Sequence, residues 1–211
     1  MYTYTTAKTL EEKQAVLALI KKIYRREGYI AENDASSAFD PYIMSDTAKV
    51  FTGFVADTLC STISVVADSD AGLPMDVLYK DEIETLRAKR KKIAEVTQFA
   101  VDHELLEKND TASSMNTRFT ASLPLLSLVL HYGLFKDLDY LCIAVHYYKH
   151  NEFYKRLGFV EIGGLKYYPS VNNTPAVAQM LDLRALRENK DSSGVLARFL
   201  EEPVDYALFS E

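Results

Sequence analysis

The chain of 211 residues has no tryptophan, only two cysteines and no long hydrophobic run. Cys60 and Cys142 lie in separate apolar segments, which predicts buried thiols and a reducing compartment. The apolar runs are far shorter than the roughly 20 residues that span a bilayer. The segment MYTYTTAKTLEEK lacks the charged start and apolar stretch of a signal peptide. We therefore expect a cytoplasmic protein without a transmembrane segment.

An excess of positive charge is also missing, because 24 Lys and Arg residues face 30 Asp and Glu residues, for a formal net charge of -6. Duplex binding is driven by neutralisation of phosphates, so nucleic acid is not an expected partner. Hydrophobic residues make up 48% of the chain and charged residues 26%, which is usual for a globular protein with a full core.

Several functional motifs are absent as well. No Gly-x-Ser-x-Gly motif is present, so covalent catalysis by such a serine is not indicated. No glycine-rich turn that could hold a pyrophosphate through its backbone amides follows the strand pattern at 93–102, because residues 103–119 are polar and mixed. His146 and His150 are four residues apart, but no third ligand is evident, so we predict no metal site.

What the sequence does contain is an alternation of strand and helix patterns that predicts one α/β domain. Thr9 and Glu12 have the spacing of a capping box before a helix that ends at Gly28. Strand patterns at 48–57 and 59–68 flank a tight connection and predict a hairpin. The remaining segments predict helices at 79–92, 120–135 and 151–156, strands at 2–8, 93–102, 138–146 and 176–183, and a strand with a loop at 159–171.

This order predicts a three-layer α/β/α domain around a central mixed, mostly antiparallel sheet. We expect the domain to cover residues 1–189. Residues 190–211 would form a polar linker and a C-terminal tail that packs on the same domain.

A glutamate interrupts the strand pattern of residues 93–102, IAEVTQFAVD, which otherwise predicts a buried strand. Alternation would place Glu95, Thr97 and Phe99 on one face. A buried unpaired carboxylate is costly, so Glu95 needs a partner or a chemical role. The alternatives are an exposed position at the start of the strand, or an ion pair with an arginine or lysine.

Residues 153–159, FYKRLGF, resemble the closing helix and strand of the GNAT acyltransferase fold. The alternative is that these aromatic residues pack against the sheet, with Gly158 ending the helix. A wider resemblance is to the long-chain N-acyl amino acid synthases, which are relatives of the acyl-homoserine-lactone synthases. It rests on GLPMDVLYKDEIETLRAKRKKIAEVTQFAVD and HYYKHNEFYKRLGF, and it covers about residues 15–185.

The resemblance implies an N-acyltransferase that moves a long-chain fatty acyl group from an acyl carrier protein thioester to the amine of an amino acid. No cofactor would stay bound, because the acyl-phosphopantetheine thioester is the donor. The missing pyrophosphate turn favours a carrier protein over coenzyme A. An acetyl-CoA-dependent N-acetyltransferase remains an alternative, as does a non-catalytic acyl-binding protein, because Gln98 stands where lactone synthases usually have arginine.

The resemblance also implies roles for individual residues. Glu95 would hold the amine and accept its proton, and Tyr154 and His150 would lie near the leaving thiol. Apolar residues of the helix at 121–135 would wall an acyl tunnel or simply pack in the core. Strand amides from Phe99 to Val101 would stabilise the tetrahedral oxygen. The expected substrate-binding residues are Arg26, Asp40, Thr97, Gln98, Phe99, Ala100 and Val101.

Arg26 would pair with Glu95 or Asp40, unless it lies at a solvated helix end and Asp40 only forms a turn before proline. Residues 87–92 hold the strongest basic cluster of the chain. Such a cluster is usually a solvated helix face, but it can also attract an acidic carrier protein. The expected docking residues are Arg87, Arg90, Lys91 and Lys92.

Overall fold

The strand patterns form one mixed sheet in the computed structural model, which describes residues 2–31, 40–109, 114–188 and 195–210. The strands are β1 (Tyr2–Thr6), β2 (Ala48–Val55), β3 (Thr58–Ala67), β4 (Ile93–Val101), β5 (Tyr140–His146), β6 (Val160–Glu161), β7 (Lys166–Tyr168) and β8 (Thr174–Asp182). The helices are α1 (Leu10–Arg26), α2 (Asp40–Met44), α3 (Asp76–Ala88), α4 (His103–Asn109), α5 (Ser114–Phe135), α6 (Tyr147–Arg156), α7 (Leu183–Glu188) and α8 (Val195–Glu201), with 3₁₀ turns η1 (Pro169–Val171) and η2 (Tyr206–Phe209).

The strand order is β1-β2-β3-β4-β5-β8-β6, with β7 also paired to β8. Only β4 and β5 run parallel in this described sheet, and the other pairs are antiparallel. The β4–β5 pairing covers just Ile93–Glu95 against Tyr140–Cys142, so the two strands separate beyond these residues. This mixed, mostly antiparallel sheet confirms the predicted fold class.

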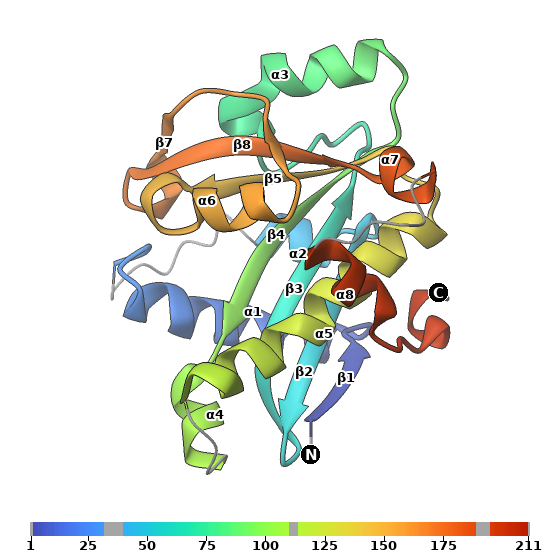
Figure 1. Ribbon diagram of the computed structural model, residues 1–211. Helices are drawn as coiled ribbons and strands as arrows, with labels where there is room; N and C mark the ends of the chain where they lie inside the picture. Colours follow the sequence, from blue (N-terminus) through green and yellow to red (C-terminus); the bar gives the residue numbers. More distant parts are fainter. Residues whose placement is uncertain (1, 32–39, 110–113, 189–194, 211) are drawn as a thin grey trace.

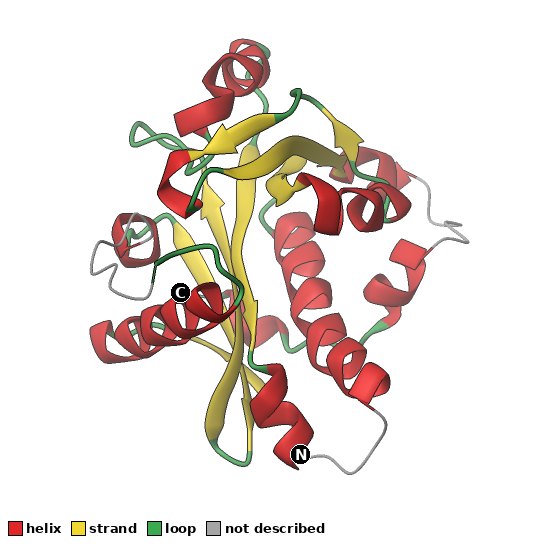
Figure 2. Ribbon diagram, turned by 90° about the vertical axis from the view of Figure 1, so that its left-hand side faces the viewer, coloured by secondary structure: helices red, strands yellow, loops and turns green. Residues whose placement is uncertain are grey.

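Helices cover both faces of the sheet (Figures 1 and 2). On one face, α1 and α2 pack against a core that includes Val50 and Ala100, and α3 packs against Val66 and Cys142. On the other face, α5 packs with α6, α7 and α8 over a core that includes Ile63 and Leu141. The three layers predicted from the sequence are therefore present.

Local signals in the sequence explain where α1 and the hairpin form. The Thr9 side chain accepts a hydrogen bond from the Glu12 N–H, and the Glu12 carboxylate accepts one from the Thr9 N–H, which confirms the capping box. Between β2 and β3, Ala56 and Asp57 both have positive φ, of 46° and 61°. This is the two-residue turn whose twist matches the flanking strands, so the predicted hairpin is also confirmed.

A β-bulge in β4 breaks the alternation that the sequence predicts. Gln98 has a φ of 55°, and the β3–β4 register shifts so that two residues, Gln98 and Phe99, oppose Ile63 alone. Phe99 consequently packs against the core on the α5 face, whereas Glu95 faces α3. The prediction that Phe99 shares a face with Glu95 was wrong, because period-two alternation does not survive a bulge.

Three helix boundaries also differ from the predictions. Helix α3 covers Asp76–Ala88 and ends before the basic residues of 89–92. Helix α6 begins at Tyr147, because the His146 side chain accepts hydrogen bonds from two backbone N–H groups at its start, a cap that usual sequence signals do not include. Residues 103–119, whose polar and mixed sequence predicts no element, contain α4 and the start of α5.

The C-terminal tail lies on the α5 face, where Phe199 and Phe209 are buried in the same core as α5. The predicted linker at 190–194 lies outside the described residues. No helix in the described ranges is long and apolar enough to cross a membrane.

Candidate active site

A cavity of about 460 Å³ lies where β4 and β5 separate, and this volume is within the usual range of small-molecule sites. Its lining includes Tyr42 and Val77 from one face of the sheet, and His150 and Tyr154 from the other. The cavity therefore passes through the sheet at the gap between the two strands. Because its two ends lie on opposite faces, two reactants can approach the same point from different sides.

Glu95 lies on this cavity, and only 3% of its surface is exposed. Its Oε2 accepts a hydrogen bond of 2.7 Å from the Met75 N–H at the start of α3. No Arg or Lys among the described residues pairs with it. Burial raises its pKa to about 8, the Met75 hydrogen bond opposes the rise, and the charge of Asp76 adds to it. Both structural alternatives considered for Glu95, an exposed position and an ion pair, are therefore wrong.

Tyr154 and His150 of α6 line the cavity on the α5 face. Burial raises the Tyr154 pKa to about 12, so its phenol keeps a proton at neutral pH. Loss of hydration lowers the His150 pKa, and positive charge on His146 and Lys149 lowers it further. The phenol is a proton donor and the neutral imidazole can accept or relay a proton, which are the properties needed beside a leaving thiol.

Four tyrosines that were not among the expected site residues also form part of the cavity wall: Tyr24, Tyr29, Tyr42 and Tyr168. Burial raises the pKa of Tyr24, and Tyr154 and Glu95 are both close enough for their charges to raise it further. Tyr24 therefore lies near the groups proposed for both ends of the reaction. The 14 tyrosines of the chain were the available signal, but composition does not say which of them meet.

The predicted substrate-binding segment of β4 divides into two parts. Thr97, Gln98 and Phe99 line the cavity. Ala100 packs in the core below α1, and Val101 packs in a core cluster beside α4, so neither is part of the lining. Of these predicted substrate-binding residues, three therefore lie on the cavity, and their role in binding stays a prediction.

The backbone direction of β4 identifies which amide faces the gap. The Asp102 N–H donates to the Cys60 carbonyl in β3 at 2.8 Å, while the Val101 carbonyl accepts from Arg26 Nη2 on the other side at 3.3 Å. Successive residues of a strand direct their backbone groups to opposite edges. The Phe99 N–H therefore points away from β3, toward the edge that β5 has left.

Arg26 does not pair with Glu95 as expected. Its guanidinium lies 3.2 Å from Asp102 Oδ1 and 3.5 Å from Glu104, and Arg26 is not part of the cavity lining. The expected pairing with Glu95 was wrong because the buried acid at the end of α1 is Asp102. Asp40 begins α2, but its side chain lies outside the described part of the structure, so its predicted role stays a prediction.

The basic cluster does not line the cavity. Pro74 and Val77, which do line the cavity, lie at the start of α3, whereas the basic cluster lies at and beyond the other end of this helix. Arg87 is occupied by ion pairs with Asp68, Asp76 and Glu84, so it was wrong to treat it as an available docking cation. Lys91 and Lys92 pair with residues after α5, at 4.0 Å with Asp139 and 2.8 Å with Asp137. Arg90 is exposed.

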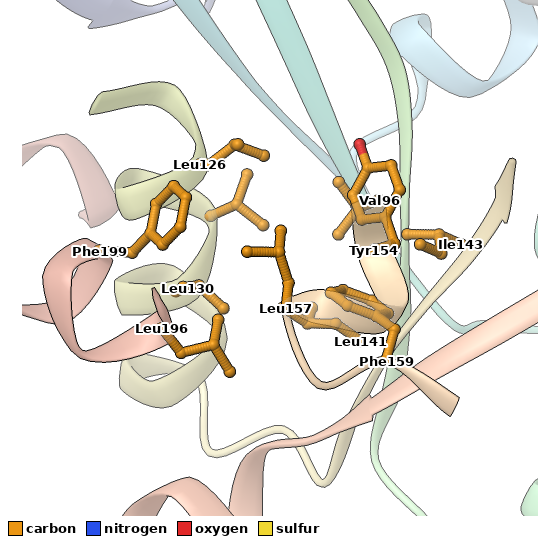
Figure 3. A pocket seen from close by; sticks show the side chains of 11 residues that line it. Val96, Leu126, Leu130, Leu141, Ile143, Tyr154, Leu157, Phe159, Leu196 and Phe199 are labelled. Carbon is orange, nitrogen blue, oxygen red and sulfur yellow. The ribbon is translucent and has the colours of Figure 1, made fainter. Parts of the chain in front are cut away.

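A second, much smaller cavity of about 20 Å³ lies deeper on the α5 face, and Figure 3 shows its side chains. It shares Val96, Ile143 and Tyr154 with the large cavity. The rest of its wall is apolar and comes from β5, α5, α8 and the segment after α6. In Figure 3 the Tyr154 hydroxyl points away from Leu157 and Phe159. The two cavities therefore adjoin at Val96, Ile143 and Tyr154, and the apolar side chains of α5 and α8 lie on the far side of the small one.

Comparisons with known proteins agree with this geometry. The model of the family described as N-acyl amino acid synthase FeeM matches residues 15–182. The solved structure of FeeM, an N-acyl amino acid synthase from uncultured soil microbes, is 35% identical, with a TM-score of 0.78 over 95% of this chain and 99% of that chain. A search of curated proteins gives no match.

More distant structures share the fold. An N-acetyltransferase from Staphylococcus aureus Mu50 is 15% identical, with a TM-score of 0.56 over 87% of this chain and 99% of that chain. The polyamine N-acetyltransferase of Drosophila melanogaster is 13% identical, with a TM-score of 0.60 over 86% of this chain and all 100% of that chain. At these identities the likeness concerns the GNAT-like fold alone.

Proposed function

The chain belongs to the FeeM family of N-acyl amino acid synthases and is an acyltransferase, and on this premise we propose how the transfer takes place. The donor is a long-chain fatty acyl thioester on the phosphopantetheine arm of an acyl carrier protein. The acceptor is the α-amine of an amino acid, and the acyl group passes directly from sulfur to nitrogen. The observation that carries this proposal is the buried Glu95 on a cavity that crosses the sheet and reaches Tyr154.

Glu95 prepares the amine. An α-ammonium group cannot attack a carbonyl until it loses a proton. The ionised Glu95 attracts the ammonium and takes that proton, directly or through water, and its pKa of about 8 makes it a stronger base than an ordinary carboxylate. The neutral nitrogen then forms a bond to the thioester carbonyl carbon.

The Phe99 N–H, directed to the open edge of β4, is the donor that we assign to the tetrahedral oxygen. When the intermediate collapses, the carbon–sulfur bond breaks and the thiolate takes a proton from the Tyr154 phenol. The nitrogen releases its remaining extra proton, which restores the phenol, with His150 available as a relay. The amide and the free thiol leave, and Glu95 returns its proton to solvent.

We place the acyl chain beyond Tyr154, between the apolar side chains of α5 and α8. The small cavity there measures only about 20 Å³, so these side chains have to move apart to admit the chain. Leu126, Val129 and Leu130 of α5 line this cavity, which supports the predicted role of the helix in an acyl tunnel. An apolar wall lowers the free energy of each buried methylene by about 0.8 kcal/mol. The tail therefore helps to hold the thioester in the gap between β4 and β5.

A carrier protein is favoured over coenzyme A by the chain that follows β4. Asp102 and the helix α4 come directly after the strand, where a glycine-rich turn would be needed to hold a pyrophosphate. The phosphopantetheine arm of a carrier protein has no pyrophosphate. For docking, the proposal retains Arg90, which is exposed, together with Lys91 and Lys92, whose charges Asp139 and Asp137 offset only in part because solvent screens the Lys92–Asp137 pair and the Lys91–Asp139 pair is 4.0 Å long. These cations attract an acidic carrier protein at long range.

The experiment supplies the purified protein with palmitoyl carrier protein or palmitoyl-CoA, together with all amino acids, and identifies products by mass spectrometry. We expect an N-acyl amino acid, formed faster from the carrier protein and lost in Glu95→Ala. Equal or faster use of palmitoyl-CoA would overturn the choice of donor. An active Glu95→Ala variant would overturn the role of Glu95. Lipid extracts of a bacterial host expressing the chain would identify the amino acid.

A further inference from the structure

Arg87 lies at the centre of a partly buried ion cluster next to the candidate site. Its Nε and Nη2 bind both oxygens of Asp68, at 2.6 to 3.2 Å. Nη2 also lies 2.7 Å from Asp76 Oδ2, and Nη1 lies 2.9 Å from Glu84. The side chains of Arg87, Asp68 and Asp76 are each less than one-fifth exposed, so solvent screens these contacts only in part.

The contact between Asp76 and Arg87 depends on an unusual backbone. The two residues lie at opposite ends of α3, about 16 Å apart if the helix were straight. Tyr79 has non-helical angles, φ -116° and ψ 30°, and the resulting kink turns the first helical turn back. Gly72 has a φ of 76°, and a side chain there would meet Asp76 Oδ2 at 2.5 Å, so the approach also requires glycine.

The backbone at the start of α3 also supplies the only hydrogen-bond donor that the structure describes for Glu95. The Leu73 N–H donates to Asp76 Oδ2 at 2.8 Å, which fixes the chain just before Met75. The Met75 N–H in turn donates to Glu95 Oε2 at 2.7 Å. Within the described residues Glu95 Oε1 has no donor, so it is left for the cavity.

We propose that Arg87 is a positioning residue for Glu95. By binding Asp76 and Asp68 it holds the start of α3 in place, keeps the Met75 N–H on one carboxylate oxygen, and compensates the two acids nearest to that side of the site. This inference rests on the proposed role of Glu95 as the base and adds how that base is held and tuned.

Charge compensation is the part that a titration can measure. Asp76 is the acid whose charge raises the Glu95 pKa. The titratable groups that interact with Glu95 are Tyr24 of α1, Tyr42 of α2, Asp76 of α3, Cys142 of β5 and Tyr168 of β7. Without Arg87, the charge of Asp76 would act on Glu95 without the cation that lies 2.7 Å from it.

The experiment measures the Glu95 pKa directly, in the full chain without substrate. Glutamate side chains are labelled with ¹³C at the carboxyl carbon, and Glu95 is assigned by its absence in Glu95→Gln. We expect Arg87→Met to raise the Glu95 pKa by roughly one unit and Asp76→Asn to lower it by a similar amount. The pH profile of kcat/KM should move in the same direction for each variant.

Arg90→Met is the matched control. It removes the same charge from an exposed side chain three residues after Arg87, and it should leave the Glu95 pKa unchanged. An unchanged pKa in Arg87→Met, or in Asp76→Asn if the first variant does not fold, overturns the proposal. If the pKa shifts as expected but the kinetic profile stays in place, Arg87 positions Glu95 but Glu95 is not the base. The two proposals therefore fail in distinguishable ways.

Discussion

A buried acid lies near each end of β4, and the two acids differ in their partners. Asp102, at the end of the strand, is 1% exposed and has two cations, with Lys22 Nζ at 2.5 Å and Arg26 at 3.2 Å. Glu95, near its start, is 3% exposed and has a single backbone donor. Asp102 is therefore paired with cations, whereas Glu95 has no cation partner among the described residues.

The pKa values follow from this difference. Burial alone would raise the Asp102 pKa, but hydrogen bonds from Lys22, the Leu105 N–H and Arg26 outweigh it and lower the pKa. For Glu95 burial prevails, and the pKa rises to about 8. A buried acid with cations stabilises the fold, here by joining α1, β4 and α4. A buried acid without them costs stability and is retained where it has chemistry to perform.

The largest expected effect comes from removing the charge of Glu95 while keeping its shape. Glu95→Gln should lower kcat/KM by at least 100-fold, the usual scale for loss of a general base. Because the folded chain binds the Glu95 proton more tightly than the unfolded chain, the stability that this proton contributes is lost as pH rises from about 5 to about 8. Thermal unfolding at pH 8.5 should therefore show that Glu95→Gln is at least as stable as the parent. A variant that is less stable but has normal activity would show that Glu95, like Asp102, serves the fold and not the chemistry.

Asp102→Asn should do the opposite. We expect a loss of about 2 kcal/mol in the free energy of unfolding at pH 7, because two charge-assisted hydrogen bonds are weakened, with kcat/KM per folded molecule within twofold of the parent. The lowered Asp102 pKa implies that its contribution is present at neutral pH and disappears as pH falls below about 4. Urea unfolding at pH 7 and pH 3 tests both statements, and a loss that persists unchanged at pH 3 would contradict them.

Most of the fold was predictable from the sequence, and part of the site was. The capping box, the hairpin and the buried strands rest on local spacing, which the structure preserves. Glu95 was selected because a charge interrupts a strand pattern, whereas Tyr154 and His150 were selected through the family resemblance, and all three line the same cavity. The bulge at Gln98 was not predictable from alternation. Nor was the tyrosine wall, because its members come together only when α1, α2 and β7 meet the gap.

Tyr154→Phe should have a smaller effect than either acid. The phenol protonates a thiolate, which already leaves readily, so we expect kcat to fall roughly tenfold with little change in KM. Steady-state kinetics with the palmitoyl carrier protein measure this change. Tyr167→Phe is the control, since Tyr167 is exposed and does not line the cavity. Equal effects of the two variants would remove Tyr154 from the mechanism.

The smallest effect concerns docking. Reversing the charge of Arg90 and Lys92 together should raise KM for the acyl carrier protein severalfold at low salt and leave kcat unchanged, because rim charges act on encounter. Lys8→Glu serves as the control, since Lys8 is exposed at the start of α1. A KM that is unchanged by the double reversal would place the docking surface elsewhere.

The most direct test of the account is the pH dependence of acyl transfer in single turnovers, with the parent and Glu95→Gln compared at saturating donor and acceptor. The account predicts that the parent rate rises with pH through an inflection near 8 and that this inflection is missing in the variant. The same inflection in both proteins would show that another group controls the reaction and would contradict the assignment of Glu95 as the base.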